Sequence, residues 1–238
     1  MEKIIHEEIS LNISDGTSMS AYAARPEVKG KFPGVLVFQE AFGVNSHIRD
    51  IADRFALDGF IAVAPELFHR TVHGFEGDYN DFNSVRKHVQ ALTVEGMSAD
   101  IKAADEWLRK DTMLLNDQVI SIGFCMGGRV SFLANSLLKL NASVSFYGGG
   151  IDSTLLDKTK DISAPHLFCW GGKDSHILKE NRDKVTEALD QHNKKYVNAV
   201  FSDAGHGFNC DQRDSYHPEA AAQAWALTKN FINTYIKV

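Results

Sequence analysis

A short turn around Cys125 has the residue types that a nucleophile needs. Residues 119–130 read VISIGFCMGGRV: a strand-like apolar run leads into Gly-x-Cys-x-Gly-Gly and then into a helical pattern. A nucleophile between a strand and a helix sits on a strained turn, and glycines at 123, 127 and 128 relieve the crowding there. The helix N-terminus favours both a thiolate and a developing oxyanion. We expect Cys125 to be reactive, although this turn alone also fits a small buried apolar residue.

Two further residues with suitable chemistry follow other predicted strands. Asp174 ends the turn GGKD after the apolar run 166–170, and His206 follows the run 196–201 in the stretch DAGHGF. The imidazole would take the thiol proton or protonate a leaving group, and the carboxylate would fix its tautomer. Alone, Asp174 equally fits an Asx turn, and His206 is one of ten histidines. The order nucleophile, acid, histidine at three predicted strand ends favours a catalytic arrangement.

The elements that must position these residues alternate along the chain. Continuous apolar runs, typical of strands buried on both faces of a parallel sheet, lie at 35–38, 60–64, 119–123, 142–147, 166–170 and 196–201. Helical patterns lie at 46–58, 95–110, 126–139, 178–192 and 217–235. This rhythm predicts an α/β fold with right-handed crossovers, in which ligands collect at the carboxyl ends of the strands.

The first residues have a different pattern. Polar and apolar residues alternate in 3–11 and 17–24, and Asp15-Gly16 between them is a turn dipeptide. We expect a hairpin whose two strands both lie at the edge of the sheet.

Composition narrows the class of protein. The chain has 238 residues, 44% hydrophobic and 24% charged, with no repeat or linker, so we expect a single domain over residues 1–238. The net charge of −6 argues against a nucleic-acid binder, which needs a basic surface.

The sequence also bears on the location of the protein. No signal peptide or membrane-length apolar run is visible. Three widely spaced cysteines favour a reducing, cytoplasmic location. We expect a monomer or small homo-oligomer without membrane or nucleic-acid partners.

Five segments resemble the dienelactone hydrolase family, over nearly the whole chain. They are FQEAFGVN at 38–45, APELF at 64–68, GFCMGGR at 123–129, GKD at 172–174 and GHGF at 205–208. The resemblance implies a three-layer α/β-hydrolase fold with a mostly parallel central sheet flanked by helices. It also implies that a small-molecule ester or lactone is opened through an acyl-cysteine intermediate, with no cofactor.

The resemblance also implies roles for individual residues. Cys125, His206 and Asp174 form the triad, and the oxyanion donors are the backbone N–H groups of Met126 and Ala41. Glu40 is a further acidic residue beside the thiol, where its charge would disfavour the thiolate and keep a neutral thiol until substrate arrives. For Glu40 the alternative is an exposed loop carboxylate.

Cations near the predicted site need separate interpretation. Arg129, in the first turn of the helix after Cys125, opposes the helix dipole, so we expect it to give electrostatic support rather than to catalyse. Members that give the family its name hold a substrate carboxylate with two arginines. The first position corresponds to Arg70, the second is occupied by Cys210, and Arg213 lies three residues further on. Because acids flank Arg213, a surface ion pair is an equal alternative. The incomplete clamp favours a broader ester, lactone or thioester specificity.

Three other features have simpler interpretations. His206 and Cys210 have metal-ligand spacing but no second pair, so we expect no metal site. Cys169, inside an apolar strand, is expected in the core. The Gly-containing stretch 69–83, with His69, His73, Phe75 and Tyr79, resembles a lid, although its side chains also fit an ordinary loop.

The sequence therefore predicts a cysteine-dependent hydrolase of the dienelactone hydrolase type. A broad carboxylesterase or thioesterase with the same triad is the alternative within enzymes. A redox sensor or binding protein is the alternative of a different class, and the complete acid-histidine pair argues against it because a sensor needs only a low-pKa cysteine.

Overall fold

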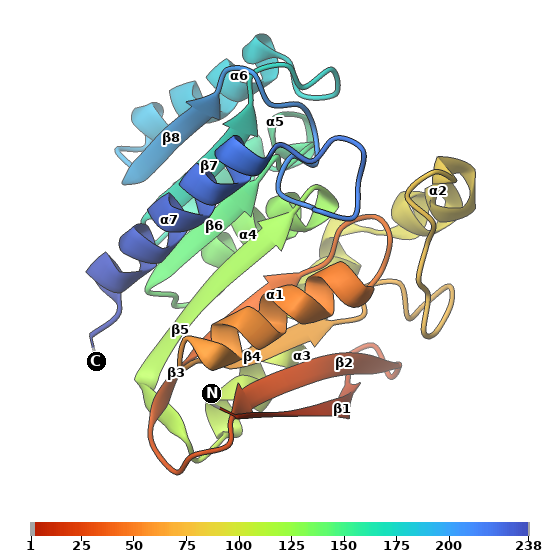
Figure 1. The fold of residues 1–238 in the computed structure, drawn as a ribbon, viewed down its shortest axis with the longest axis vertical. Coiled ribbons are helices and arrows are strands. Elements are labelled where there is room, and N and C mark those ends of the chain that lie inside the picture. The colour runs from red at the N-terminus through yellow and green to blue at the C-terminus, as the bar shows by residue number, and fades with distance from the viewer. Residues whose placement is uncertain (1–2, 238) are drawn as a thin grey trace. The chain divides into compact units, whose positions relative to one another are not determined.

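The computed structural model describes residues 3–237, which form two compact units, residues 3–120 and 121–237 (Figure 1). A single domain over residues 1–238 stays a prediction. Among the described residues, no helix combines the length and the apolar character needed to cross a membrane.

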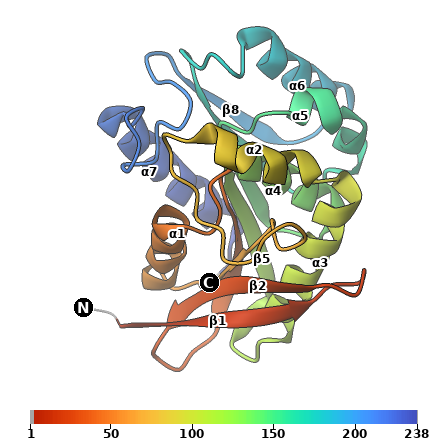
Figure 2. The same cartoon turned by 90° about the vertical axis from the view of Figure 1, so that its right-hand side faces the viewer.

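The first unit is a small sheet with helices on both faces. Its strands follow the order β1-β2-β4-β3 and are β1 (Ile4–Asn12), β2 (Ser18–Pro26), β3 (Phe32–Phe38) and β4 (Ile61–Pro65). Strands β3 and β4 are parallel, with Val35 opposite Ala62. Helices α1 (Ser46–Leu57) and α3 (Val94–Lys110) cover opposite faces of these strands (Figure 2), and α2 (Phe82–Ala91) lies apart from the strands (Figure 1).

Local sequence explains where the first helix begins. The Asn45 side chain caps α1 by accepting a hydrogen bond from the N–H of Ile48, at 3.3 Å. The helix then buries an apolar face that includes Ile48, Ile51 and Phe55 against the strands. The residues just before α1 are therefore fixed at the carboxyl end of β3.

The predicted hairpin is confirmed, but the prediction that both of its strands are edge strands is wrong for β2. Strand β1 pairs only with β2 among the described strands, whereas β2 also pairs antiparallel with β4. Met19, Ala21 and Ala23 alternate along β2 and are buried. The same alternation occurs in any strand with one covered face, so the pattern could not reveal the second neighbour.

The second unit repeats the layered arrangement. Its strand order is β5-β6-β7-β8, where β5 (Leu114–Phe124) enters the unit at residue 121 and is followed by β6 (Ala142–Phe146), β7 (His166–Gly171) and β8 (Tyr196–Phe201). Strands β6, β7 and β8 are parallel. Helices α4 (Met126–Leu137) and α7 (Pro218–Tyr235) lie on opposite faces, and α6 (Lys179–Gln191) lies on the α4 side (Figures 1 and 2).

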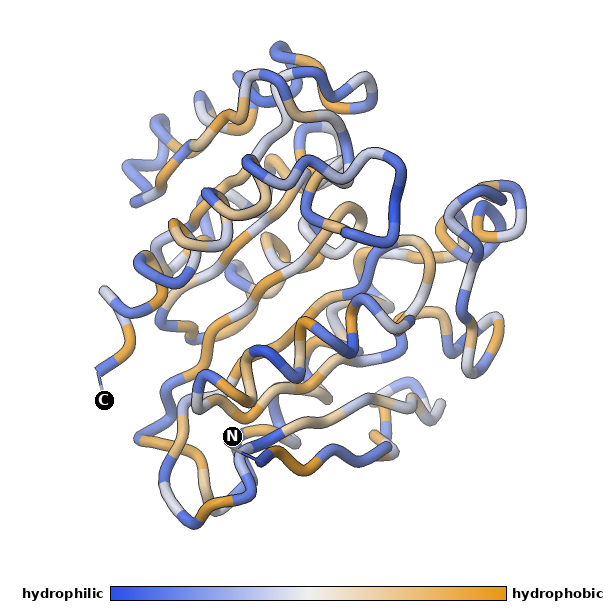
Figure 3. Tube along the Cα trace, viewed as in Figure 1, coloured by the Kyte–Doolittle hydropathy of each residue, from blue (hydrophilic) through white to orange (hydrophobic). Residues whose placement is uncertain are grey.

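The predicted α/β fold, mostly parallel and flanked by helices, is confirmed. Apolar residues are concentrated in the strands, and polar residues dominate the loops and the outer helix faces (Figure 3). The sequence did not predict α2, the short helix α5 (Ile151–Thr154) or the 3-10 helix η1 (Leu156–Asp161). A sequence signal for α2 was available, because Phe82, Val85 and Val89 recur at spacings of three and four residues.

Candidate active site

The backbone at Cys125 is strained. Cys125 follows β5 and precedes α4, with φ 54° and ψ −119°, a region that residues with a Cβ rarely adopt. The turn is held because the N–H of Cys125 donates to the carbonyl of Phe146, at 3.0 Å. It also needs a glycine at 123, since a Cβ there would lie 1.9 Å from the carbonyl oxygen of Gly127. The strained turn predicted from the glycine pattern is therefore present.

His206 and Asp174 lie beside the Cys125 thiol in the second unit. His206 Nε2 is 3.1 Å from Cys125 Sγ, and His206 Nδ1 is 2.7 Å from Asp174 Oδ2. The second carboxylate oxygen of Asp174 accepts hydrogen bonds from the N–H groups of His176 and Ile177, at 2.8 and 3.1 Å. The Asp174 side chain is only 1% exposed, whereas that of His206 is 13% exposed. The acid is thus fixed, and the imidazole connects it to the sulfur.

The charges of this group are coupled. Burial disfavours the His206 imidazolium, but the negative sulfur of Cys125 and the Asp174 carboxylate outweigh it and raise the pKa of His206 to about 10. Burial would raise the pKa of Asp174, yet the hydrogen bond from His206 and the N–H groups of His176 and Ile177 hold it below its ordinary value. The Asp174 carboxylate and the Cys125 sulfur thus favour the charged form of His206.

The N-terminus of α4 and Arg129 flank the sulfur. Met126 is the first residue of α4, so its N–H belongs to the helix end that carries a partial positive charge. Burial lowers the pKa of Arg129, and the charge of Cys125 opposes that shift. The Arg129 guanidinium also packs against Gly150, where a Cβ would lie 3.1 Å from Nη1. This location agrees with an electrostatic role for Arg129.

Two rings next to His206 were not predicted. The ring of Tyr147 lies 5.1 Å from that of His206, and the ring of His176 lies 5.3 Å away at 82°. Tyr147 is buried and has φ 38°. Its sequence signal was a tyrosine at the end of a strand, directly before three glycines.

Glu40 and Ala41 belong to the first unit. Both follow the carboxyl end of β3 and are buried, so the alternative of an exposed loop carboxylate at Glu40 is wrong. The Glu40 carbonyl accepts hydrogen bonds from Gln39 Nε2, at 3.2 Å, and from the N–H of Gly43, at 3.4 Å. Their predicted roles beside the thiol stay predictions.

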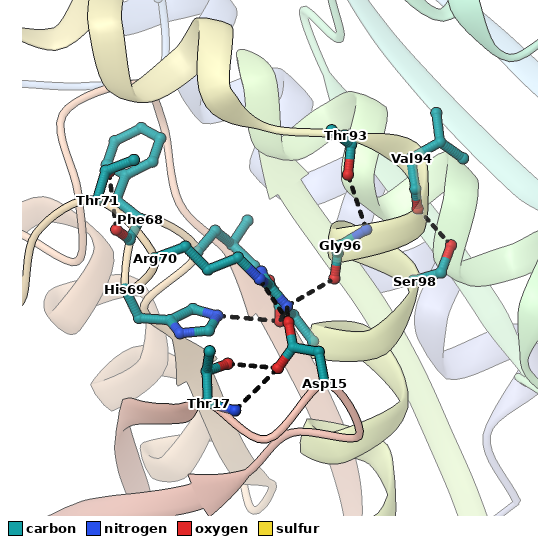
Figure 4. Close-up of polar contacts among 12 residues, drawn as sticks. Asp15, Thr17, Phe68, His69, Arg70, Thr71, Thr93, Val94, Gly96 and Ser98 are labelled. Atoms are coloured by element: carbon teal, nitrogen blue, oxygen red, sulfur yellow. Dashed lines mark hydrogen bonds and ion pairs between the residues drawn. The ribbon is translucent and has the colours of Figure 1, made fainter.

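Arg70 is held by acids of its own unit (Figure 4). Its Nη1 and Nη2 each donate to the Asp100 carboxylate at 2.8 Å, and its Nε donates to Asp15 at 2.7 Å. The hydrogen bond and charge of Asp100 raise the pKa of Arg70 against the effect of burial. A substrate carboxylate would compete with both acids, and the predicted substrate contact stays a prediction.

Arg213 lies close to the histidine loop. A Cβ at Gly207 would lie 2.6 Å from the guanidinium carbon of Arg213, so that cation packs directly beside the residue after His206. The turn is closed by N–H to carbonyl hydrogen bonds from Cys210 to Gly207, at 3.0 Å, and from Arg213 to Cys210, at 3.2 Å. Of the two arginines predicted to hold a substrate carboxylate, Arg213 is therefore the one that lies beside the residue after His206.

The other two cysteines are buried. Cys169 is 0% exposed inside β7, which confirms the prediction of a core residue, and burial raises the pKa of its thiol. Cys210 is also buried.

Comparison with known proteins gives one family. A model of the dienelactone hydrolase family matches residues 19–236. A Synechocystis protein named "Putative carboxymethylenebutenolidase" is 33% identical over 228 residues, covering 92% of this chain and 93% of the relative. An Escherichia coli K12 protein with the same name is 37% identical over 235 residues, covering 93% of this chain and 84% of the relative.

Solved structures agree. A Klebsiella pneumoniae structure named "Putative Dienelactone Hydrolase" has a TM-score of 0.87 and 33% identity, covering 98% of this chain and 100% of that one. Brefeldin A esterase, at 13% identity and a TM-score of 0.72, shares the fold over 98% of this chain and 77% of its own. The chain belongs to the dienelactone hydrolase family.

Proposed function

We propose that this protein hydrolyses ester or lactone bonds through a covalent acyl-cysteine, with Cys125 as nucleophile, His206 as acid and base, and Asp174 as its partner. One observation carries the proposal: His206 contacts Cys125 Sγ at 3.1 Å and Asp174 Oδ2 at 2.7 Å, with Cys125 on a strained turn before a helix. Membership of a hydrolase family supports it.

The first half of the reaction forms the acyl-enzyme. The Cys125 proton is held by His206, and Sγ attacks the acyl carbon while the carbonyl π electrons move to its oxygen. The N–H groups of Met126 and Ala41 stabilise this oxyanion, an arrangement in which one donor follows the nucleophile and the other comes from the β3–α1 loop. As the carbonyl reforms, the bond to the alkoxy oxygen breaks and the imidazolium protonates that oxygen. In a lactone the leaving hydroxyl stays attached to the acyl group.

The second half releases the acid. His206 Nε2 takes a proton from water, and the hydroxide attacks the thioester carbon. The tetrahedral adduct collapses with cleavage of the C–S bond, which returns Cys125 as a thiolate facing the imidazolium. Asp174 keeps its charge throughout and stabilises the imidazolium.

For Glu40 we propose the role that the resemblance implies, which is to suppress the thiolate until substrate displaces the carboxylate. The alternative is an imidazolium–thiolate pair in the free protein, because His206 Nε2 lies 3.1 Å from Cys125 Sγ. Thiolate absorbance near 240 nm measured in wild type and Glu40→Gln separates the two states. A thiolate signal that appears only in Glu40→Gln supports the role, and equal signals reject it.

For the substrate we propose an anionic ester or lactone whose carboxylate pairs with Arg213, because that cation packs beside the histidine loop. Asp100 and Asp15 accept hydrogen bonds from all three guanidinium nitrogens of Arg70, so a substrate carboxylate at Arg70 would compete with both acids. A neutral aryl ester would not use this pairing.

The decisive experiment compares hydrolysis of a dienelactone and of a neutral aryl ester by wild type, Cys125→Ala and Cys169→Ala. Circular dichroism confirms that each variant folds. Cys169→Ala removes another thiol of the same unit and serves as the matched control. We expect turnover in wild type and Cys169→Ala, and a loss of at least about 10³-fold in Cys125→Ala.

Each outcome has a distinct meaning. Cys125-dependent dienelactone turnover supports the anionic substrate, whereas Cys125-dependent cleavage of the neutral ester alone indicates a broad carboxylesterase. Full activity in folded Cys125→Ala rejects the acyl-cysteine mechanism. Peroxide modification of Cys125 without hydrolysis of either ester indicates a redox sensor.

A further inference from the structure

The loop of residues 39–45 joins β3 to α1 and carries Glu40 and Ala41, and every residue in it is buried. The loop has only short-range structure of its own, a single bridge between Glu40 and Gly43. Its shape must therefore depend on what packs against it. In the first unit, one partner is the segment of residues 75–80, which precedes α2 and is here named the strap.

The strap docks on the loop through its backbone. The N–H of Gly77 donates to the carbonyl of Phe42, at 3.0 Å. Gly43 has φ 85° and approaches so closely that a Cβ there would lie 1.8 Å from the carbonyl oxygen of Phe75. A side chain at position 43 would push the strap away, so this glycine permits the contact.

Side chains extend the contact along the whole loop. The Phe42 ring packs against Tyr79, with centroids 4.5 Å apart, and Asn45 Nδ2 donates to the Tyr79 hydroxyl at 2.9 Å. Since Asn45 Oδ1 caps α1, a single side chain links the strap to the start of the helix. Arg49 makes two hydrogen bonds to Glu76, at 2.7 and 3.2 Å, and one to the carbonyl of Val44, at 2.6 Å.

Both ends of the strap region are anchored. Before it, His69 Nε2 lies 3.1 Å from Asp100 of α3, and Arg70 bonds the same carboxylate (Figure 4). After it, Asp81 caps α2 by accepting from the N–H groups of Asn83 and Ser84. Burial alternates between these anchors, with Phe75, Gly77 and Tyr79 half-buried and the residues between them exposed. One face of the strap therefore rests on the loop.

We propose that the strap holds the β3–α1 loop in the conformation that aims its oxyanion donor, and that Tyr79 is a positioning residue for this donor. The proposal rests on the proposed function, because Ala41 N–H is a donor only in that mechanism. Tyr79 acts through Phe42, the neighbour of Ala41, and through Asn45. If the strap lifts, the loop loses its support, so movement of this segment and assembly of the oxyanion site are coupled.

The test is Tyr79→Phe, which deletes the hydroxyl and keeps the ring on Phe42. Tyr196→Phe is the matched control, because the Tyr196 hydroxyl also bonds a side chain at 2.9 Å, Asp190, in the other unit. Two reactions of Cys125 are measured: hydrolysis of a neutral aryl ester, which forms an oxyanion, and alkylation by iodoacetamide, which does not.

We expect kcat for the ester to fall about tenfold in Tyr79→Phe, with KM and the alkylation rate within about twofold of wild type, because losing a donor completely costs 10²- to 10³-fold. Tyr196→Phe should match wild type in all three quantities. Glu76→Gln weakens the contact of the exposed Glu76 side chain with Arg49, so kcat should fall about two- to threefold while KM and the alkylation rate stay unchanged. This variant replaces Tyr79→Phe as the test if Tyr79→Phe does not fold.

Other results overturn the proposal. Unchanged kcat means that the loop does not need Tyr79. A parallel fall in alkylation means that the change damages the nucleophile instead of the donor, and a rise in KM alone means that Tyr79 contacts substrate. A wild-type protein that hydrolyses neither the dienelactone nor the aryl ester rejects the proposed function and this proposal with it. An active wild type together with an unchanged kcat in Tyr79→Phe rejects this proposal alone.

Discussion

His206 and His166 belong to the same unit, and each has a hydrogen-bond partner at both ring nitrogens. The pKa of His206 is raised to about 10, whereas burial lowers that of His166 to about 3. His206 lies between Asp174 and Cys125, which carry or acquire negative charge. His166 lies between two neutral groups, Ser145 Oγ at 2.8 Å and Asn135 Nδ2 at 3.3 Å. The charge of the partners, not burial alone, decides whether a histidine here is an imidazolium.

The neutral histidine has a defined tautomer. The Ser145 hydroxyl donates to the carbonyl of Gly128 in the first turn of α4, at 2.6 Å, so His166 Nε2–H must donate to Ser145 Oγ. Asn135 Nδ2 then donates to His166 Nδ1. This series of hydrogen bonds connects β6 and β7 to α4, the helix that follows Cys125. His166 thus supports the structure around the site, whereas His206 is the histidine proposed to carry out its chemistry.

Removing the charge beside His206 should have the largest effect on activity. Asp174→Asn keeps the shape of the acid but loses its charge and allows the wrong tautomer, so we expect kcat/KM to fall on the order of 10³- to 10⁴-fold. His166→Gln is the comparison, and its kcat/KM should stay within about tenfold of wild type because His166 does not touch the triad. Steady-state ester hydrolysis measures both, and a fall of less than about tenfold in Asp174→Asn would contradict the role of the acid.

The next prediction concerns the charge of the sulfur. Cys125 makes the largest contribution that raises the pKa of His206, so Cys125→Ala should lower that pKa clearly below about 10 while leaving the pKa of His166 near 3. Histidine NMR titration of the wild type and the variant measures both values. An unchanged His206 titration would show that Asp174 alone sets its charge.

The candidate triad could be predicted because local rules place it. Gly123 must be a glycine wherever a nucleophile turn approaches the next helix this closely, and Asp174 and His206 each follow an apolar run that forms a strand. These signals lie within a few residues of each group, so the sequence carries them without knowledge of the fold.

Contacts between distant segments could not be predicted. Arg70 is held by Asp15 and Asp100, which lie 55 and 30 residues away along the chain. Tyr147 and His176 lie next to His206 because β6, β7 and β8 are neighbours in the sheet. Residues 76–79 dock on residues 42–49 through contacts between two stretches that are far apart in the sequence. Spacing along the chain contains none of this information.

The last prediction concerns the contribution of the neutral His166 to stability in acid. The pKa of His166 is about 3 in the folded chain and near its ordinary 6.5 when unfolded, so the unfolded chain takes up this proton first as pH falls. The stabilisation is complete above about pH 6.5 and is lost toward pH 3, at up to about 1.4 kcal/mol per pH unit. In His166→Gln this contribution is absent, so its free energy of unfolding should fall less steeply between pH 6 and 4. Urea unfolding at several pH values tests this, and equal slopes would mean that His166 does not remain neutral in the core.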